Sequence, residues 1–243
     1  MNLYNYSKLL LKKSYKDCLN LDITKDKKKY LSAKFKHSKK ALNMACKIYN
    51  VCKEDGILYL LHDIGRFRVV IDHVENEDHA HYGYKYLYNK RLFDEEVLLP
   101  IMLHETDMGW EDKLNSLKFF QNLNEVEKNR VVINIRRLKD VDILSNMIEK
   151  LKDTKIECDL NRDIYNNLLN GMICNNDYEG AINRALYIIC GIYILSTPES
   201  LNYVKESGLI KKYFNKVLNK LKKCDLKDKL LKCKECLIEK GYI

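Results

Sequence analysis

Apolar positions along the chain recur mainly with the spacing of α-helices. Between residues 33 and 49 they fall on one helical face. A second helical run covers 54–65 and is predicted to end at Gly65, because glycine often terminates helices. Residues 66–76 look irregular or extended, and no run alternates with the period of two that is typical of a half-buried strand.

The helical pattern continues through the rest of the chain. Further helices are predicted at 78–90, 94–104, 125–150, 159–169, 178–195, 199–206 and 209–223. In the third of these, Asp142 continues an apolar stripe formed by Val131, Ile135 and Leu138. Asp142 is therefore predicted to face the core, and Asp140 lies about 200° around the helix from it. The sequence predicts an all-α protein.

Composition agrees with this fold class and limits the partners. The 243 residues include only 9 Gly and 2 Pro, and 46% are hydrophobic, which suits helices around a sizeable core. Lys+Arg exceed Asp+Glu by 43 − 34 = 9. That excess could attract phosphates, but we interpret most of it as a Lys-rich surface, so nucleic acid is not the expected partner. The longest apolar run, 185–195, is too short to span a bilayer, so no membrane partner is expected.

The cysteines and the N-terminus predict a cytoplasmic location. Nine cysteines are scattered along the chain, as is typical of reduced thiols. The N-terminal sequence MNLYNYSKLLLKK lacks the apolar core of a secretory leader.

Candidate chemistry begins at the decapeptide LYLLHDIGRF, in which four apolar residues lead into His62 and Asp63. Burying an imidazole and a carboxylate without partners would be costly, and a metal ion would remove that cost. His37 lies on the apolar face of its helix, and His104 follows the apolar segment PIML. Each histidine alone is more often a hydrogen-bonded core residue. Together with Asp142 they form a ligand set that suits first-row metals.

With these residues on one chain, the sequence resembles the HD-domain superfamily of metal-dependent phosphohydrolases, in its HDIG-type bacterial branch. The family pattern is a histidine, a His-Asp pair and a distant aspartate, matched here by His37, His62-Asp63 and Asp142. FKHSKKALNMA looks like the first helix of the family. RRLKDVDILSNM is similar to the segment with the last aspartate, where the second acid is usually the ligand. The resemblance implies an HD-domain helical bundle with additional C-terminal helices.

Family members that bind two metals carry two more histidines. His79, four residues before Gly83, matches one of them, and His104 matches the other. His81 or His73 could replace His79. The resemblance implies one or two divalent first-row ions (iron, manganese, zinc, nickel or cobalt), with Asp63 bridging two of them. The other ligands would divide into His37, His62 and Asp142 for one ion, and His79 and His104 for the other.

The resemblance also implies a reaction. A metal-bound hydroxide would cleave a phosphate ester or anhydride of a nucleotide or another small phosphorylated substrate. Besides Asp63, Arg66 is the expected catalytic residue, because a guanidinium forks onto phosphate oxygens. Otherwise Arg66 is a surface residue paired with Asp72 or Glu75. Glu105 either orients a ligand or is an ordinary helix carboxylate.

Two other functions stay open. The same ligand set serves HD-type di-iron oxygenases that act on organic or phosphonate substrates. The basic tails would alternatively suit a non-catalytic module that binds nucleic acid or metal. The Gly-Tyr-Pro signature and the doubled histidine of cyclic-dinucleotide phosphodiesterases are absent from the sequence. The natural substrate and the oligomeric state are therefore not predicted.

The domain organisation follows from the extent of the resemblance. The resemblance implies that 30–215 form an HD phosphohydrolase domain, and residues 1–29 are expected to form a basic helical extension. Residues 216–243 form a Lys/Cys-rich helical tail, expected to pack on the same domain.

Overall fold

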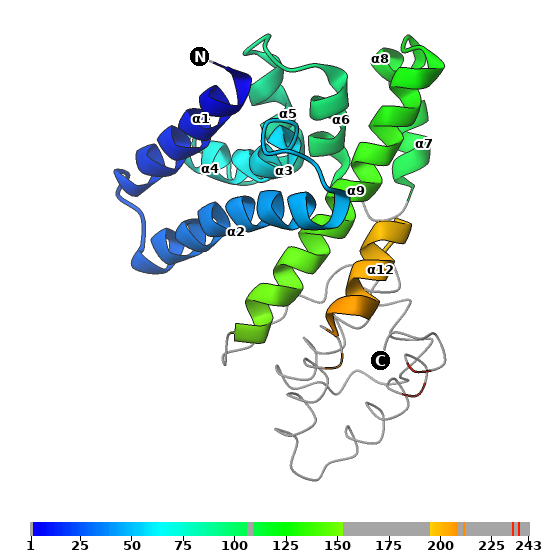
Figure 1. Ribbon diagram of the computed structural model, residues 1–243. Coiled ribbons are helices and arrows are strands. Elements are labelled where there is room, and N and C mark those ends of the chain that lie inside the picture. The colour runs from blue at the N-terminus through cyan, green and yellow to red at the C-terminus, as the bar shows by residue number, and fades with distance from the viewer. Residues whose placement is uncertain are drawn as a thin grey trace, which may run out of the picture. The chain divides into compact units, whose positions relative to one another are not determined.

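Helices make up all the regular secondary structure in the described part of the chain (Figure 1). This computed structural model describes residues 2–105, 109–152 and 195–208, together with 211, 235 and 238. The predicted all-α class is confirmed for these residues. Apart from isolated positions, several predicted segments lie outside them: the helices at 159–169, 178–195 and 209–223, and the tail 216–243.

The chain divides into two compact units, 1–145 and 146–243. The first contains α1 (Leu3–Leu19), α2 (Lys25–Tyr49), α3 (Ile57–Leu61), α4 (Ile64–Ile71), α5 (His79–Tyr88), α6 (Glu95–Leu103), α7 (Trp110–Asn115), α8 (Lys118–Gln121) and most of α9 (Glu125–Lys152). The second contains α12 (Pro198–Ser207). The predicted division into 1–29, 30–215 and 216–243 stays a prediction.

Four helices of the first unit begin at residues that cap them. The side chains of Asn2, Thr24, Asp78 and Asp94 accept hydrogen bonds from backbone N–H groups in the first turns of α1, α2, α5 and α6. Such caps satisfy donors that have no partner within the helix. The Asp78 cap makes His79 the first residue of α5, which fixes where that imidazole leaves the backbone.

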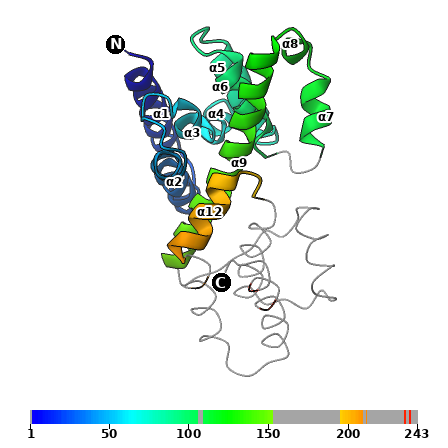
Figure 2. The same cartoon turned by 45° about the vertical axis from the view of Figure 1, so that its right-hand side comes forward.

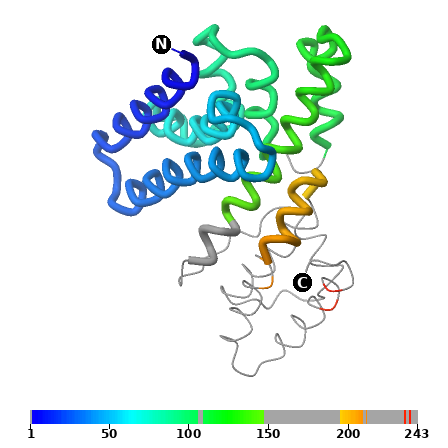
Figure 3. Tube along the Cα trace, viewed as in Figure 1, coloured from blue at the N-terminus to red at the C-terminus, as the bar shows by residue number. Residues whose placement is uncertain are grey.

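The helices of the first unit surround α3, of which every residue is buried. A short connection joins α1 to α2 (Figure 3), and α1 packs on α2, α3 and α4. On the other side, α6 lies beside α9 in both ribbon views (Figures 1 and 2). Their shared core contains Leu99, Leu103, Val131 and Ile135. This packing brings the ends of α3 and α6 close to the middle of α9.

The prediction that a helix ends at Gly65 is wrong. α3 ends at Leu61, and Gly65 is the second residue of α4, which also replaces part of the predicted irregular segment 66–76. Gly65 does not end a helix; it allows α4 and α5 to pack closely. A Cβ at Gly65 would lie 1.8 Å from the carbonyl oxygen of His79. The absent side chain lets α5 approach α4 and places His79 next to the His62-Asp63 pair.

The other boundaries agree better with the prediction. The helices predicted at 78–90, 94–104 and 125–150 correspond to α5, α6 and α9 with differences of one or two residues. α2 begins earlier than predicted, and α7 and α8 were not predicted. Among the described residues, no helix combines the length and hydropathy needed to cross a membrane.

Candidate metal centre

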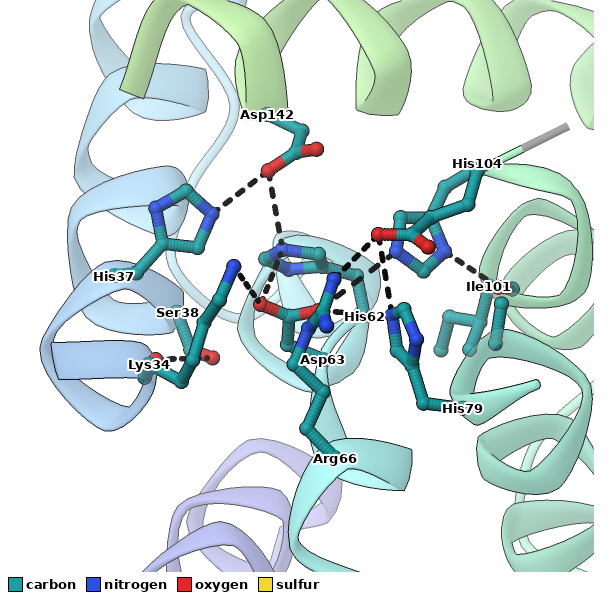
Figure 4. Close-up of polar contacts among 12 residues, drawn as sticks. Lys34, His37, Ser38, His62, Asp63, Arg66, His79, Ile101, His104 and Asp142 are labelled. Atoms are coloured by element: carbon teal, nitrogen blue, oxygen red, sulfur yellow. Dashed lines mark hydrogen bonds and ion pairs between the residues drawn. The ribbon is translucent and has the colours of Figure 1, made fainter. Parts of the chain in front are cut away.

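Histidine and carboxylate side chains from five parts of the first unit converge on one buried site (Figure 4). Two of the candidate ligands lie within helices, and four stand at helix termini. His37 lies within α2, and Asp142 lies within α9. The others stand at helix termini: His62 at the end of α3, Asp63 before α4, His79 at the start of α5 and His104 at the end of α6.

The first group of possible ligands is His37, His62 and Asp63. Each offers one ligand atom, and the three atoms lie within 4.8 Å of one another. Asp142 adjoins this group from α9. Its Oδ1 accepts a hydrogen bond from His37 Nε2 at 2.7 Å and lies 3.6 Å from His62 Nε2. Residues far apart in the sequence thus supply a mixed imidazole and carboxylate set.

The second group is Asp63, His79, His104 and Glu105, whose ligand atoms also lie within 4.8 Å of one another. His79 Nε2 lies 3.3 Å from Asp63 Oδ1 and 3.3 Å from Glu105 Oε1. His104 Nε2 is 3.9 Å from the same Asp63 oxygen. Asp63 therefore belongs to both groups, as a carboxylate that joins two neighbouring sites would.

Backbone hydrogen bonds fix the orientation of two of the imidazoles. His62 Nδ1 donates to the Tyr59 carbonyl at 2.8 Å, and His104 Nδ1 donates to the Ile101 carbonyl at 2.7 Å. Both rings therefore turn Nε2 into the site. Ligand histidines in proteins commonly use their second ring nitrogen in this way.

Several atoms that face the site are buried without a hydrogen-bond partner among the described residues. They are Nε2 of His62, His79 and His104 and Oδ2 of Asp63. An unsatisfied buried polar atom costs about 1–3 kcal/mol. One cation in each of the two groups would pair with these atoms, so the residues present fit one or two divalent metal ions.

The carboxylates of the site are held in their charged form. Burial alone would raise the pKa of Asp63, but Arg66 and Lys34 hold it well below its ordinary value. Burial opposes the charge on Asp142 too, yet the hydrogen bond from His37 and the nearby His62 imidazole hold its pKa well below the usual range. Charged carboxylates are the form that binds metal ions.

Two imidazoles respond to the site in opposite ways. Burial lowers the pKa of His79. Burial would also lower the pKa of His62, but the negative charges of Asp63 and Asp142 raise it. The imidazole form that binds a metal ion is the neutral one.

The structure brings together all six of the predicted ligand positions: His37, His62, Asp63, His79, His104 and Asp142. The two alternatives to His79 lie elsewhere. His73 is exposed, and the His81 ring stacks on Tyr84 at 6.1 Å. Their assignment as ligands stays a prediction.

Arg66 lies in the site and not on the surface. Its Nε donates to Asp63 Oδ1 at 2.6 Å, and its guanidinium also contacts Glu105 and the Tyr30 hydroxyl. The alternative pairing of Arg66 with Asp72 or Glu75 is wrong. Arg68 pairs with Asp72, and Lys27 pairs with Glu75.

Sequence reasoning missed Lys34 and underrated Glu105. Lys34 Nζ lies 3.4 Å from Asp63 Oδ2, and the negative charge of Asp63 raises the pKa of Lys34 against the effect of burial. One signal was available, because Lys34 precedes His37 by one helical turn and so shares its face. For Glu105, its position next to His104 was the only feature of the sequence that indicated a place in the site.

Over the described residues, fold and site define an all-helical structure with buried histidine and aspartate clusters that could hold metal ions. No family model, curated protein or solved structure matches the chain. The resemblance to the HD-domain superfamily thus stays a hypothesis that rests on the motifs.

Proposed function

We propose that the chain is a metal-dependent phosphohydrolase of the HD-domain type. Its substrate would be a phosphate ester or anhydride of a nucleotide or another small phosphorylated compound. One observation carries the proposal: two groups of metal-ligating side chains share Asp63, and two cationic side chains, Lys34 and Arg66, flank that same carboxylate. Metal ligands and phosphate-binding cations in one buried site suit phosphoryl transfer.

The residues divide into two ligand sets for one or two divalent ions. His37, His62 and Asp142 would hold one ion, and His79, His104 and Glu105 the other, with Asp63 common to both. A divalent ion in such a site acts as a Lewis acid and lowers the pKa of water towards about 7.

Lys34 and Arg66 would bind the phosphoryl group. Lys34 approaches Asp63 Oδ2 from α2, whereas Arg66 approaches Oδ1 from α4, so the two cations reach the carboxylate at different atoms (Figure 4). Arg66 forks onto oxygens, and Lys34 adds a compact charge. Glu105 and Tyr30 contact the Arg66 guanidinium and would keep it oriented towards the site.

The experiment is a metal-reconstituted activity screen. Purified protein is stripped with a chelator, reloaded separately with manganese, iron, nickel, cobalt or zinc, and assayed with nucleotides, dinucleoside polyphosphates and a generic phosphate ester. We expect hydrolysis with at least one metal and none in the stripped protein. Absence of turnover in protein shown to contain metal would contradict the proposal.

The two other functions have distinct outcomes in the same preparation. Oxygen consumption with an organic or phosphonate substrate in the iron-loaded protein would favour a di-iron oxygenase. Salt-sensitive binding of nucleic acid that His62→Ala leaves unchanged would favour a non-catalytic module.

A further inference from the structure

A second candidate site is a pocket lined mainly by residues of α1 and α2, with Lys53 and Leu60 completing the lining. It is a pocket of about 550 Å³, a size typical of small-molecule sites. None of the candidate metal ligands lines it. Its lining includes four leucines, which are Leu9, Leu11, Leu42 and Leu60.

Aromatic rings form part of the wall. Tyr15 and Phe35 stack on one another with ring centroids 4.4 Å apart and an angle of 10° between their planes. Because these two rings are stacked directly on one another, no space remains between them for a flat base or ring of a ligand. The aliphatic part of the lining is suited instead to a flexible alkyl chain, which needs contact area and no directional polar partner.

All charged residues that line the pocket are positively charged. Five lysines line it and no acidic residue does; the lysines are Lys8, Lys12, Lys16, Lys39 and Lys53. Within the described residues none of the five forms an ion pair. Lys39 Nζ lies 4.1 Å from the centre of the Phe35 ring, so one cation is held directly beside the apolar wall.

We propose that this pocket binds one molecule of an anionic amphiphile with an unbranched alkyl chain, of the fatty-acid class. The leucines and aromatic rings contact the chain, and the lysines bind the carboxylate. The combination of an apolar lining with a rim of like-charged cations distinguishes this ligand from a neutral or cationic one. The proposal stands independently of the proposed hydrolase activity.

The experiment is a calorimetric titration of the full chain with dodecanoate below its micelle concentration. Two probes separate the contributions: dodecyltrimethylammonium keeps the chain and reverses the head-group charge, and butyrate keeps the carboxylate and shortens the chain. We expect saturable binding of one dodecanoate per chain, with both other probes at least about tenfold weaker.

Two sets of variants locate the binding site. Lys12→Glu with Lys39→Glu reverses charge at the pocket and should weaken dodecanoate binding about tenfold. The matched control, Lys13→Glu with Lys47→Glu, makes the same change in net charge on the same two helices at exposed residues that do not line the pocket. The control should bind as the natural protein does. Asn43→Trp, at an exposed lining residue, should block the pocket without changing charge.

Three results would overturn the proposal. One is equal binding of the cationic amphiphile. The second is dodecanoate binding that Asn43→Trp and the pocket charge reversal leave unchanged. The third is binding to anionic lipid vesicles with no binding of monomeric dodecanoate, which would show a membrane surface instead of a pocket ligand.

Discussion

Among single residues, Lys34 tests whether cationic side chains in the site bind the phosphoryl group of the substrate. It is not a metal ligand, because an ammonium group has no lone pair to donate. Replacing it by methionine keeps the length and removes the charge. We expect Lys34→Met to lower kcat/KM about 10²-fold or more while metal content stays unchanged, since one phosphate-binding cation is lost.

The matched control is Lys36→Met, an exposed position two residues further along α2. It should keep full activity and metal content, as measured by steady-state kinetics and elemental analysis. Equal loss in the two variants would show that Lys34 acts only through the general charge of the surface.

The pair Asp142 and Asp140 separates metal binding from stability. Asp142 contacts His37 and His62, whereas Asp140 lies about 200° around α9 from it and is fully buried. We expect Asp142→Ala to weaken metal binding at least about tenfold, measured by calorimetry. Asp140→Ala should retain metal but lower the free energy of unfolding by about 1–3 kcal/mol, because it removes a fully buried polar side chain that interacts with its surroundings.

Several candidate ligand positions could be predicted from the sequence because they adjoin apolar patterns, whereas His79 was found only from the family resemblance. His62 and His104 follow apolar runs, and Asp142 continues an apolar stripe. Lys34 and Glu105 carry no such mark, since long side chains occur on most helix surfaces. Their place beside Asp63 depends on which helices become neighbours, and that information lies in tertiary packing. The helical phase predicted different faces for Asp140 and Asp142 but did not reveal that Asp140 is fully buried as well.

At the scale of elements, the crossing of α4 and α5 controls the position of His79. A Cβ at Gly65 would meet the backbone of α5 at 1.8 Å, whereas a Cβ at Gly83 would lie 3.2 Å from its nearest neighbour, the Gly65 nitrogen. We therefore expect Gly65→Ala to lower the free energy of unfolding by about 1–3 kcal/mol and Gly83→Ala to lower it by less. Chemical denaturation of the two variants measures both.

The same pair tests the link between the crossing and the site. If α5 is pushed away, His79 leaves Asp63, so Gly65→Ala should also weaken metal binding more than Gly83→Ala does. A Gly65→Ala protein with natural stability and natural metal affinity would contradict the close approach.

Element types were predictable where caps and periodicity agree, as in α5 and α6. The break between α3 and α4 could not be predicted in this way. Gly65 was interpreted as a local helix end, yet its role is set by His79, which is distant in sequence. A single glycine does not distinguish these two uses.

At the scale of the whole molecule, a buried thiol makes stability depend on alkaline pH. Burial raises the pKa of Cys18 to about 12, and its Sγ donates to the Phe67 carbonyl. Above about pH 8.5 the unfolded thiol loses its proton while the folded one keeps it, so the unfolded state binds fewer protons. Stability should therefore fall between the two pKa values, by up to about 1.4 kcal/mol per pH unit for this group.

The measurement compares the natural protein with Cys18→Ser by urea unfolding from pH 8 to pH 11. Serine keeps a donor for the Phe67 carbonyl and does not titrate in this range. The difference in stability between the two proteins should shrink or reverse as pH rises. Burial also raises the pKa of Tyr59, so some alkaline loss persists in both proteins. Parallel curves would mean that Cys18 ionises as readily when folded as when unfolded.

Elemental analysis of metal-reconstituted protein determines whether Asp63 joins two ligand groups into one metal centre. The natural chain should contain one or two divalent ions, and Asp63→Ala should contain none while circular dichroism still reports a helical fold. Natural protein without bound metal, or an Asp63→Ala protein with undiminished metal content, would show that the side chains around Asp63 do not form a shared metal centre.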